Sequence, residues 1–396
     1  MSDIAKPPSR LLEVARLFTR LGFTAFGGPA AHIALMEDEV VVRRKWIDRG
    51  HFIDLVAALN FIPGPNSTEL AIHLGLIRAG VPGLIVAGLC FIVPAVLIIL
   101  PLAFIYVTYG QVPQVQPILG AISAAVIAIV AVAAIRFART SLRDGFTISI
   151  AIIALALALH LRHETRFPPE LLILALAGLA GAVRTVRPRN VVTLPAMYFF
   201  TVPEWPRQIA TMFVCFLRIG ATLFGSGYVL ISYLHAGLVE QRGWMTNQQL
   251  LDAVAIGQFT PGPLLTTATF IGYFLGHARF GLGIAGGVAC GVLATIAIFL
   301  PSFILIALFA PILDRLRRNR TARGALDGMN AAVVSLIVVV AGQLALANFR
   351  STGTLHFDLI HVAIFAAALI ILLCMKVNAT WIIIASGLIG VIRSLV

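Results

Sequence analysis

Apolar runs as long as a bilayer is thick dominate this sequence and constrain its fold more than any other feature. Two very long runs cover residues 81–109 and 281–313. Three further spans follow each of them, at about residues 117–138, 145–161, 169–187, 325–347, 357–375 and 379–394. A helix needs about 20 apolar residues to cross the hydrocarbon core. Only 12% of the residues are charged, about half the share of a soluble domain. The sequence therefore predicts an all-α polytopic protein in a lipid bilayer.

Charge and motif content exclude several classes of function. A net charge of +12 would suggest nucleic-acid binding in a soluble protein. Here Lys and Arg lie in short loops between apolar runs, where they set membrane topology, so we expect no nucleic-acid partner. The four cysteines have no metal-ligand or paired spacing, and no nucleotide-binding or hydrolase motif occurs. We expect no cofactor, no metal and no catalytic residue, and the polar first residues are unlike a signal peptide.

An internal repeat divides the chain into two homologous halves. A constant offset of 198 residues, the difference between positions 20 and 218, aligns residues 18–88 with 216–286 without a gap. The matched pairs include Arg20 with Arg218, Phe26-Gly27 with Phe224-Gly225, Arg44 with Arg242, Trp46 with Trp244, Asp54 with Asp252, and Pro63-Gly64-Pro65 with Pro261-Gly262-Pro263. We therefore expect one repeat at residues 1–190 and a second at 208–396, with residues 191–207 as the linker.

The loops that follow the two longest runs indicate that the halves are inverted. The loop YGQVPQVQP of the first half has no Lys or Arg. The matching loop of the second half contains Arg315, Arg317, Arg318, Arg320 and Arg323. Cytoplasmic loops are enriched in Lys and Arg. Equivalent loops are thus expected on opposite sides of the membrane, as in an inverted-topology repeat.

The doubled PGP turn is the strongest functional signal. Two prolines around a glycine break a helix, so we expect broken helices at residues 63–65 and 261–263, with Pro65 and Pro263 as the first residues of new helices. Free N–H groups at a helix start inside a membrane form an anion site. The side chains that add donors to these two starts are Asn66, Ser67, Thr68, Thr266 and Thr267. The alternative interpretation is a pair of purely structural kinks.

A second doubled break lies at FGGP, residues 26–29, and FGSG, residues 224–227. The glycine-rich residues expected near the substrate are Gly27, Gly28, Gly225 and Ser226. Arg20 and Arg218 precede the breaks by seven residues, two helical turns, and are expected on the same helix face as the breaks. Arginine in an apolar helix marks a functional position by default and suits oxyanions. The alternative is an arginine that reaches the interface or pairs with a carboxylate.

Carboxylates are few in the apolar parts of the chain. Glu69 lies one turn after the first PGP, where the second half has Thr267. It could carry a coupling proton, or it could simply sit against the helix N-terminus. The run at residues 37–39 is expected to form a solvated face, and Asp54 and Asp252 are expected to form ion pairs with Arg44 and Arg242, respectively.

These motifs resemble the chromate ion transporter family. FGGPAAHIALMEDEVVVRRKWID and LVAALNFIPGPNSTELAIHLGLIRAG look like its N-terminal half. FGSGYVLISYLHAGLVEQRGW, DAVAIGQFTPGPLLTTATFIGYFLG and FLPSF look like its C-terminal half. The resemblance implies a long, two-domain, multi-pass protein of the bacterial inner membrane that exports chromate, gives chromate resistance and uses protons. It carries this function onto Arg20, residues 26–29 and 63–65, Arg218, residues 224–225 and 261–263.

Two alternatives stay open at this point. Chromate and sulfate are both tetrahedral dianions, so a sulfate or related oxyanion carrier has the same sequence requirements. A membrane-embedded enzyme acting on a phosphorylated lipid would use the same anion sites, with Ser67, Glu69 and His73 as its only candidate groups. A homodimer is considered as a candidate assembly.

Overall fold

The computed structural model describes residues 9–110, 112–161, 169–185, 208–225, 227–313, 319–349, 358–375 and 377–395. Within these ranges the regular structure is entirely helical, which confirms the expected all-α class. The linker expected at residues 191–207 lies outside the described residues, as do Arg315, Arg317 and Arg318.

The first half begins with a helix that ends at the glycine break. Its elements are α1 (Arg10–Thr24), α2 (Pro29–Glu37), the π-helix η1 (Asp38–Arg43), α3 (Arg49–Leu59) and α4 (Ser67–Tyr109). Three more helices follow, α5 (Gln116–Ser141), α6 (Gly145–His160) and α7 (Pro169–Thr185). The helix bounds agree with the spans expected from the sequence to within a few residues.

The second half repeats this order, including a π-helix at the equivalent place. Its first elements are α8 (Gln208–Thr222), α9 (Val229–Leu234), the π-helix η3 (His235–Glu240), α10 (Asn247–Phe259), the 3-10 helix η4 (Leu264–Thr266), α11 (Thr267–Phe274) and the π-helix η5 (Leu275–Arg279). The remaining elements are α12 (Gly283–Phe309), the 3-10 helix η6 (Ala310–Ile312), α14 (Arg320–Phe349), α15 (Leu359–Cys374) and α16 (Ala379–Leu395).

Four of the described helices are long and apolar enough to cross a membrane. They are α4, α5, α12 together with η6, and α14. The helices α6, α8, α15 and α16 are apolar but shorter. This pattern supports the expected multi-pass membrane protein.

The helix that leaves each PGP turn folds back on itself as a hairpin. In α4 the backbone leaves the helical conformation at Ala79 and Gly80, and the two segments on either side pack together. A Cβ atom on Gly75 would overlap the carbonyl oxygen of Gly83, so the segments are in backbone contact. In the second half, α11 packs against α12 in the same way, with Gly272 against Cys290.

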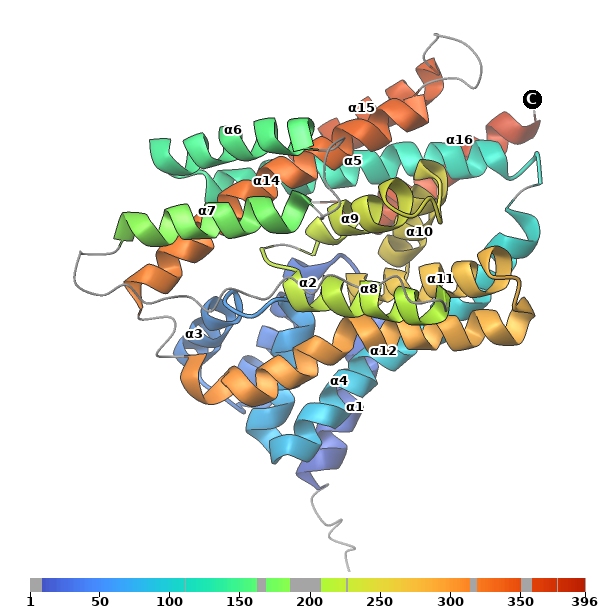
Figure 1. Cartoon of the computed structure of the whole chain (residues 1–396). Coiled ribbons are helices and arrows are strands. Elements are labelled where there is room, and N and C mark those ends of the chain that lie inside the picture. The colour runs from blue at the N-terminus through green and yellow to red at the C-terminus, as the bar shows by residue number, and fades with distance from the viewer. Residues whose placement is uncertain are drawn as a thin grey trace, which may run out of the picture.

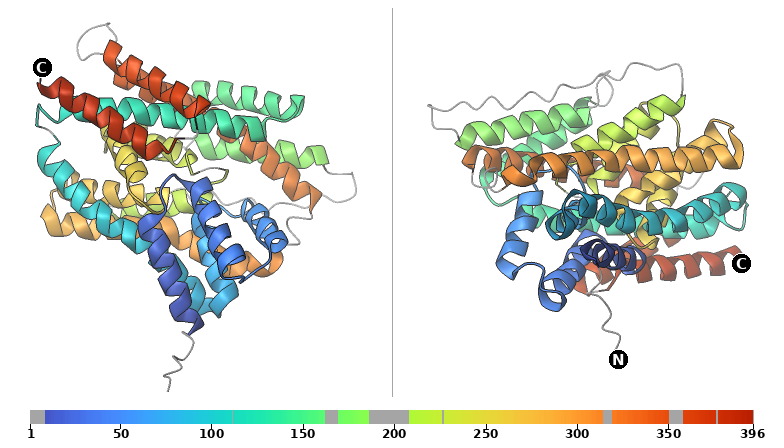
Figure 2. Two further views of the ribbon diagram at one scale, coloured as in Figure 1. Left: turned by 180° about the vertical axis from the view of Figure 1, so that it is seen from behind. Right: turned by 90° about the horizontal axis from the view of Figure 1, so that it is seen from below.

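The two halves are interleaved in two layers (Figure 1). One layer contains α5–α7 and α14–α16, in which α5 packs against α14, α15 and α16, while α14 packs against α5, α6 and α7. The other layer contains α1, α4, α8, α11 and α12. The later segment of α4 runs toward the right of Figure 1 and α12 runs toward the left, which fits the expected inversion. Figure 2 shows the same opposed directions from behind.

Equivalent segments of the two halves have different surroundings. The helix α10 packs against α5, α14 and α16 of one layer and against α11 of the other. Its counterpart α3 packs against α4. The second half therefore supplies the element that lies between the layers (Figure 1).

We expect the Gly75→Ala variant to be less stable than the wild type by about 1–3 kcal/mol, because the new methyl group must push the hairpin segments apart. Gly342→Ala in α14 is the control, because no atom lies within 4 Å of its Cβ position. That change should be neutral or stabilising by up to about 1 kcal/mol, since alanine is the better helix former. Thermal unfolding of the detergent-purified variants measures both, and equal melting temperatures would contradict the close hairpin.

Candidate functional site

One hydrogen bond joins each PGP turn to the residue just before the glycine break of the other half. The N–H group of Gly64 donates to the carbonyl of Leu223 at 2.7 Å, and the N–H group of Gly262 donates to the carbonyl of Ala25 at 3.0 Å. Donors and acceptors are both related by the offset of 198 residues, so the two bonds are equivalent under the internal symmetry. The repeated motifs therefore meet each other rather than lying apart.

All four breaks converge near Gly227 in the interior. The Cβ position of Gly227 lies 3.6 Å from Pro29 Cγ, 3.9 Å from Pro65 Cβ and 3.5 Å from Leu264 Cδ2. The PGP residues at 63–65 and 261–263 are all buried. Broken backbone at membrane depth is tolerated where protein surrounds it, and this is the arrangement found here.

The helix starts differ from the sequence expectation. Pro65 was expected to be the first helical residue, but α4 begins at Ser67 because Asn66 has a positive φ of 55°. Pro263 precedes a short 3-10 turn, with an extended ψ of 138°, and α11 begins only at Thr267. The expectation of a helix start at either proline is therefore wrong. In each case the bond to the opposite half fixes the turn before the helix begins.

The start of α4 places several buried polar groups together. Glu69 is fully buried, accepts a hydrogen bond of 2.5 Å from Ser302 Oγ of α12, and faces the backbone N–H groups of Asn66 and Glu69 itself. A side chain on Gly64 would overlap the Glu69 carboxylate. Ser67 Oγ and Thr68 Oγ1 are buried and have no hydrogen-bond partner in the described part of the chain. These are donors that a bound anion can use.

The start of α11 is polar but satisfied. Thr266 Oγ1 donates to the carbonyl of Pro263 at 2.6 Å, and Thr267 Oγ1 donates to that of Leu264 at 2.8 Å. Both threonines are fully buried. Thr267 occupies the position equivalent to Glu69, so only the start of α4 has an ionisable side chain in its first turn.

The glycine breaks at the ends of α1 and α8 face the other layer. Positive φ angles occur at Gly27 (100°), Gly28 (79°) and Gly225 (93°). The Cβ position of Gly27 lies 3.4 Å from the side-chain Nδ2 of Asn378, the residue before α16. The Cβ position of Gly225 lies 3.1 Å from Asn330 Oδ1 in α14. Ser226 lies outside the described residues. The breaks therefore lie where polar side chains of the two layers approach.

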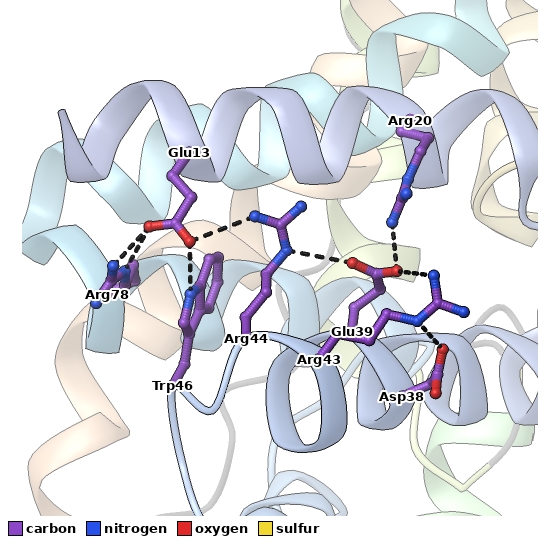
Figure 3. A network of polar contacts seen from close by, with 8 residues as sticks. All are labelled: Glu13, Arg20, Asp38, Glu39, Arg43, Arg44, Trp46 and Arg78. Atoms are coloured by element: carbon purple, nitrogen blue, oxygen red, sulfur yellow. Dashed lines mark hydrogen bonds and ion pairs between the residues drawn. The ribbon is translucent and has the colours of Figure 1, made fainter. Parts of the chain in front are cut away.

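Arg20 belongs to an ion-pair network. Its Nη2 contacts Glu39 Oε1 at 2.5 Å, and Glu39 also contacts Arg43 at 3.3 Å and Arg44 at 3.2 Å (Figure 3). Burial opposes ionisation of Glu39, but the hydrogen bonds and charges of Arg20 and Arg44 outweigh it and lower the pKa of Glu39. The expectation that residues 37–39 form a solvated face is wrong for Glu39, which is only 5% exposed.

A second carboxylate, Glu13, extends the same network along α1. Glu13 accepts hydrogen bonds from Arg44 at 3.3 Å, Trp46 at 3.0 Å and Arg78 at 2.6 Å (Figure 3). The guanidinium of Arg78 also lies over the Trp46 ring at 5.3 Å. Arg44 therefore pairs with Glu13 and Glu39, two partners that the sequence did not predict.

Arg218, the counterpart of Arg20, is not neutralised in this way. Its Nε is buried and has no hydrogen-bond partner among the described residues. Because α1 ends at Thr24 and α8 at Thr222, the glycine breaks lie beyond these helices and share no helix face with the arginines. The same-face expectation is therefore wrong. Arg242 donates to the carbonyl of Gly237 at 2.8 Å instead of pairing with Asp252.

Asp252 forms a buried polar cluster that the sequence did not predict. Tyr106 donates to it at 2.7 Å, Ser123 at 3.2 Å and Gln248 at 2.9 Å. Tyr106 also lines a cavity of about 410 Å³. Other residues of this cavity are Trp244, Thr246, Gln249 and Arg279. The repeat singles out Asp252, but its partners Tyr106 and Ser123 lie more than a hundred residues away in the sequence, which no local pattern reveals. Within the described residues, no group of three His, Cys, Asp or Glu side chains could hold a metal ion.

Comparisons with known proteins agree with the repeat. A family model described as chromate transporter matches residues 12–182 and 210–391. A chromate transport protein of Pseudomonas aeruginosa is 30% identical over 98% of this chain and 94% of its own length. Those of Cupriavidus metallidurans and Synechococcus elongatus, the latter named "Probable chromate transport protein", are each 28% identical, over 98% and 86% of this chain and 94% and 86% of their own lengths. No solved structure matches.

We expect Glu39→Gln to lower the free energy of unfolding at pH 7 by about 1–3 kcal/mol. The loss is moderate because Arg20 and Arg43 are 49% and 62% exposed and return to solvent easily. A carboxylate whose pKa is lowered by folding stabilises the fold above its unfolded pKa of about 4.3, and this contribution is lost as the pH falls through the folded pKa. The difference between variant and wild type should therefore shrink in acid.

Thermal or denaturant unfolding between pH 3 and pH 7 tests this. Glu37→Gln is the matched control, because its partner Arg49 is 77% exposed and an exposed pair contributes about 0.5 kcal/mol or less. A wild-type advantage over Glu39→Gln that does not change with pH would contradict the assigned role of Glu39.

Proposed function

The chain belongs to the chromate transporter family, and on this premise we propose that it is a secondary transporter that exports chromate across the bacterial inner membrane. Export of the anion would give the cell resistance to chromate. We further propose that protons drive the movement, since no motif for binding ATP occurs in the sequence. The family is one of transporters, so the chain is not an enzyme acting on a phosphorylated lipid.

The pair of symmetric hydrogen bonds between Gly64 and Leu223, and between Gly262 and Ala25, carries this proposal. Substrate sites of inverted-repeat transporters lie where discontinuous helices of the two halves meet near the middle of the bilayer. These bonds support such a site at the convergence of the PGP turns and the glycine breaks.

The groups available there suit an oxyanion. A helix start contributes about half a positive charge, and the unpartnered hydroxyls of Ser67 and Thr68 add donors at the start of α4. Asn66 is adjacent. Glu69 is the only ionisable residue in this first turn, and loss or gain of its proton changes the charge that faces the anion. This supports Glu69 as the coupling residue.

Burial supports a transport cycle with a closed state. Ser67, Thr68 and Glu69 are at most 1% exposed, so an anion cannot reach them in this conformation. The turns must separate from the opposite half for binding and release. Sulfate is the second candidate substrate, because it presents the same tetrahedral dianion to the same donors.

We expect purified protein in liposomes to accumulate chromate when a pH gradient is imposed, and protein-free liposomes not to. Gly262→Ala should reduce the rate at least about tenfold, because the residue has a φ of 101° and its Cβ position lies 2.9 Å from Ala95 Cβ. Gly342→Ala should transport normally. Competition with excess sulfate separates the two substrates, and absence of chromate flux under either gradient direction would refute the proposal.

We expect Glu69→Gln to bind chromate but to lose the dependence of flux on the pH gradient, because an amide cannot exchange a proton. Ser302→Ala is the matched variant. It removes the hydroxyl that contacts Glu69 while keeping the carboxyl group, so flux should still respond to the gradient. An unchanged pH response in Glu69→Gln would remove Glu69 from the coupling mechanism.

A further inference from the structure

The ion-pair network of the first half has a counterpart in which two of its four arginines remain and its carboxylates are missing. Arg20, Arg44 and Trp46 correspond to Arg218, Arg242 and Trp244. The three carboxylates are replaced by uncharged residues. Thr211, Ala236 and Gly237 occupy the positions of Glu13, Asp38 and Glu39. The positions of Arg43 and Arg78 are occupied by Gln241 and Gly276.

The local backbone is nevertheless the same in both halves. The π-helix η1 is matched by η3, and the N–H group of Trp46 donates to Val40 at 2.7 Å as that of Trp244 donates to Leu238 at 2.8 Å. The guanidinium of Arg44 lies over the Trp46 ring at 6.0 Å, and that of Arg242 over the Trp244 ring at 5.5 Å. Gly237 thus occupies the place of Glu39 in an equivalent frame.

The space next to Gly237 is bordered by Arg242 and Cys215. The Cβ position of Gly237 lies 3.4 Å from Cys215 Sγ and 3.9 Å from Arg242 Nη1. In the first half Arg20 and Arg44 contact the Glu39 carboxylate at 2.5 Å and 3.2 Å, so the internal symmetry indicates that their counterparts Arg218 and Arg242 face the position next to Gly237. Arg218 Nε is buried and unpartnered within the described residues. Glu240, the acidic residue of the same segment, contacts His235 at 3.6 Å and Gln343 at 3.3 Å.

We propose that Arg218 and Arg242 bind a divalent tetrahedral oxyanion at the position that the Glu39 carboxylate fills in the first half. Two guanidinium groups carry two positive charges, and their planar donors match the oxygens of such an anion. Among the described residues, neither Arg218 nor Arg242 has the direct carboxylate contact that Arg20 and Arg44 make with Glu39, and the proposed anion supplies that negative charge. The inference rests on the proposed oxyanion transport and adds a binding position formed by Arg218, Arg242 and the space next to Gly237.

The decisive variant restores the missing carboxylate. Gly237→Glu reproduces the arrangement around Glu39, and its Cβ position is free of overlap. We expect it to weaken the binding of sulfate and of chromate at least about tenfold, because the built-in carboxylate neutralises the arginines and repels the anion. Equilibrium dialysis of the detergent-purified, full-length protein with each anion measures the dissociation constant.

Two matched variants test the place of the site. Gly237→Gln puts an uncharged side chain into the same position and should also weaken binding, but less than Gly237→Glu, because its amide takes the place of the anion without neutralising the arginines. Gly145→Glu adds the glutamate at an exposed glycine at the start of α6, where no atom lies within 4 Å of the Cβ position; solvent screens the charge there, so this variant should bind normally. An equal loss of affinity in Gly145→Glu and Gly237→Glu would show a general effect and would overturn the proposal, as would wild-type affinity in Gly237→Glu.

The binding experiment tests the arginine site separately from the liposome experiment, which tests chromate transport. If liposomes containing the wild type move no chromate while Gly237→Glu selectively weakens sulfate binding, the proposed function fails and the arginine site stands. If wild-type liposomes move chromate and Gly237→Glu binds both anions normally, the proposed function stands and the arginine site is refuted.

Discussion

The structure depends on satisfying four interrupted helix ends inside an apolar interior. Each break frees N–H and carbonyl groups that water cannot reach, and an unpaired backbone group there costs several kcal/mol. Each half pairs with free groups of the other: the N–H group of Gly64 donates to the carbonyl of Leu223, and the N–H group of Gly262 donates to the carbonyl of Ala25. Because each half completes the backbone of the other, neither repeat forms this centre alone. The same requirement explains why the breaks are present in both halves.

The internal symmetry constrains backbone and charge to different degrees. Hydrogen bonds, π-helices and arginine–tryptophan stacking recur in both halves, because packing of the same helix order leaves little freedom. Charges need not recur. Glu39 is buried among arginines on one side, while Gly237 leaves the matching arginines without a carboxylate. Likewise Glu69 occupies one helix start, and Thr267 the other. A scaffold with two similar arrangements can thereby fill one of them with its own carboxylate and leave the other without one.

Local pattern was sufficient to predict much of this fold. Apolar runs gave the spans, and the constant offset identified the paired breaks, because both signals are contained in neighbouring residues. The partners of Arg20 and Asp252 were not predictable, since Glu39, Tyr106 and Ser123 reach them only through tertiary packing. The helix starts were misplaced for a related reason. Proline chemistry alone favours a start at the proline, but contact with the opposite half fixes the preceding turn and delays the helix.

Burial and symmetry together limit how this centre can work. The start of α4 is closed to solvent, whereas Arg20 is half exposed and Arg218 is partly buried. For an ion to reach the centre, the protein must therefore adopt a conformation in which the two hydrogen bonds between the halves are broken or re-formed elsewhere. Those bonds are made by glycines in left-handed or extended backbone, where rotation meets little steric resistance. Each opening exposes both a helix start and the carbonyl that had covered it. Under the proposed function, the N–H groups of Gly64 and Gly262 that such an opening frees would join the hydroxyls of Ser67 and Thr68 as donors to the anion.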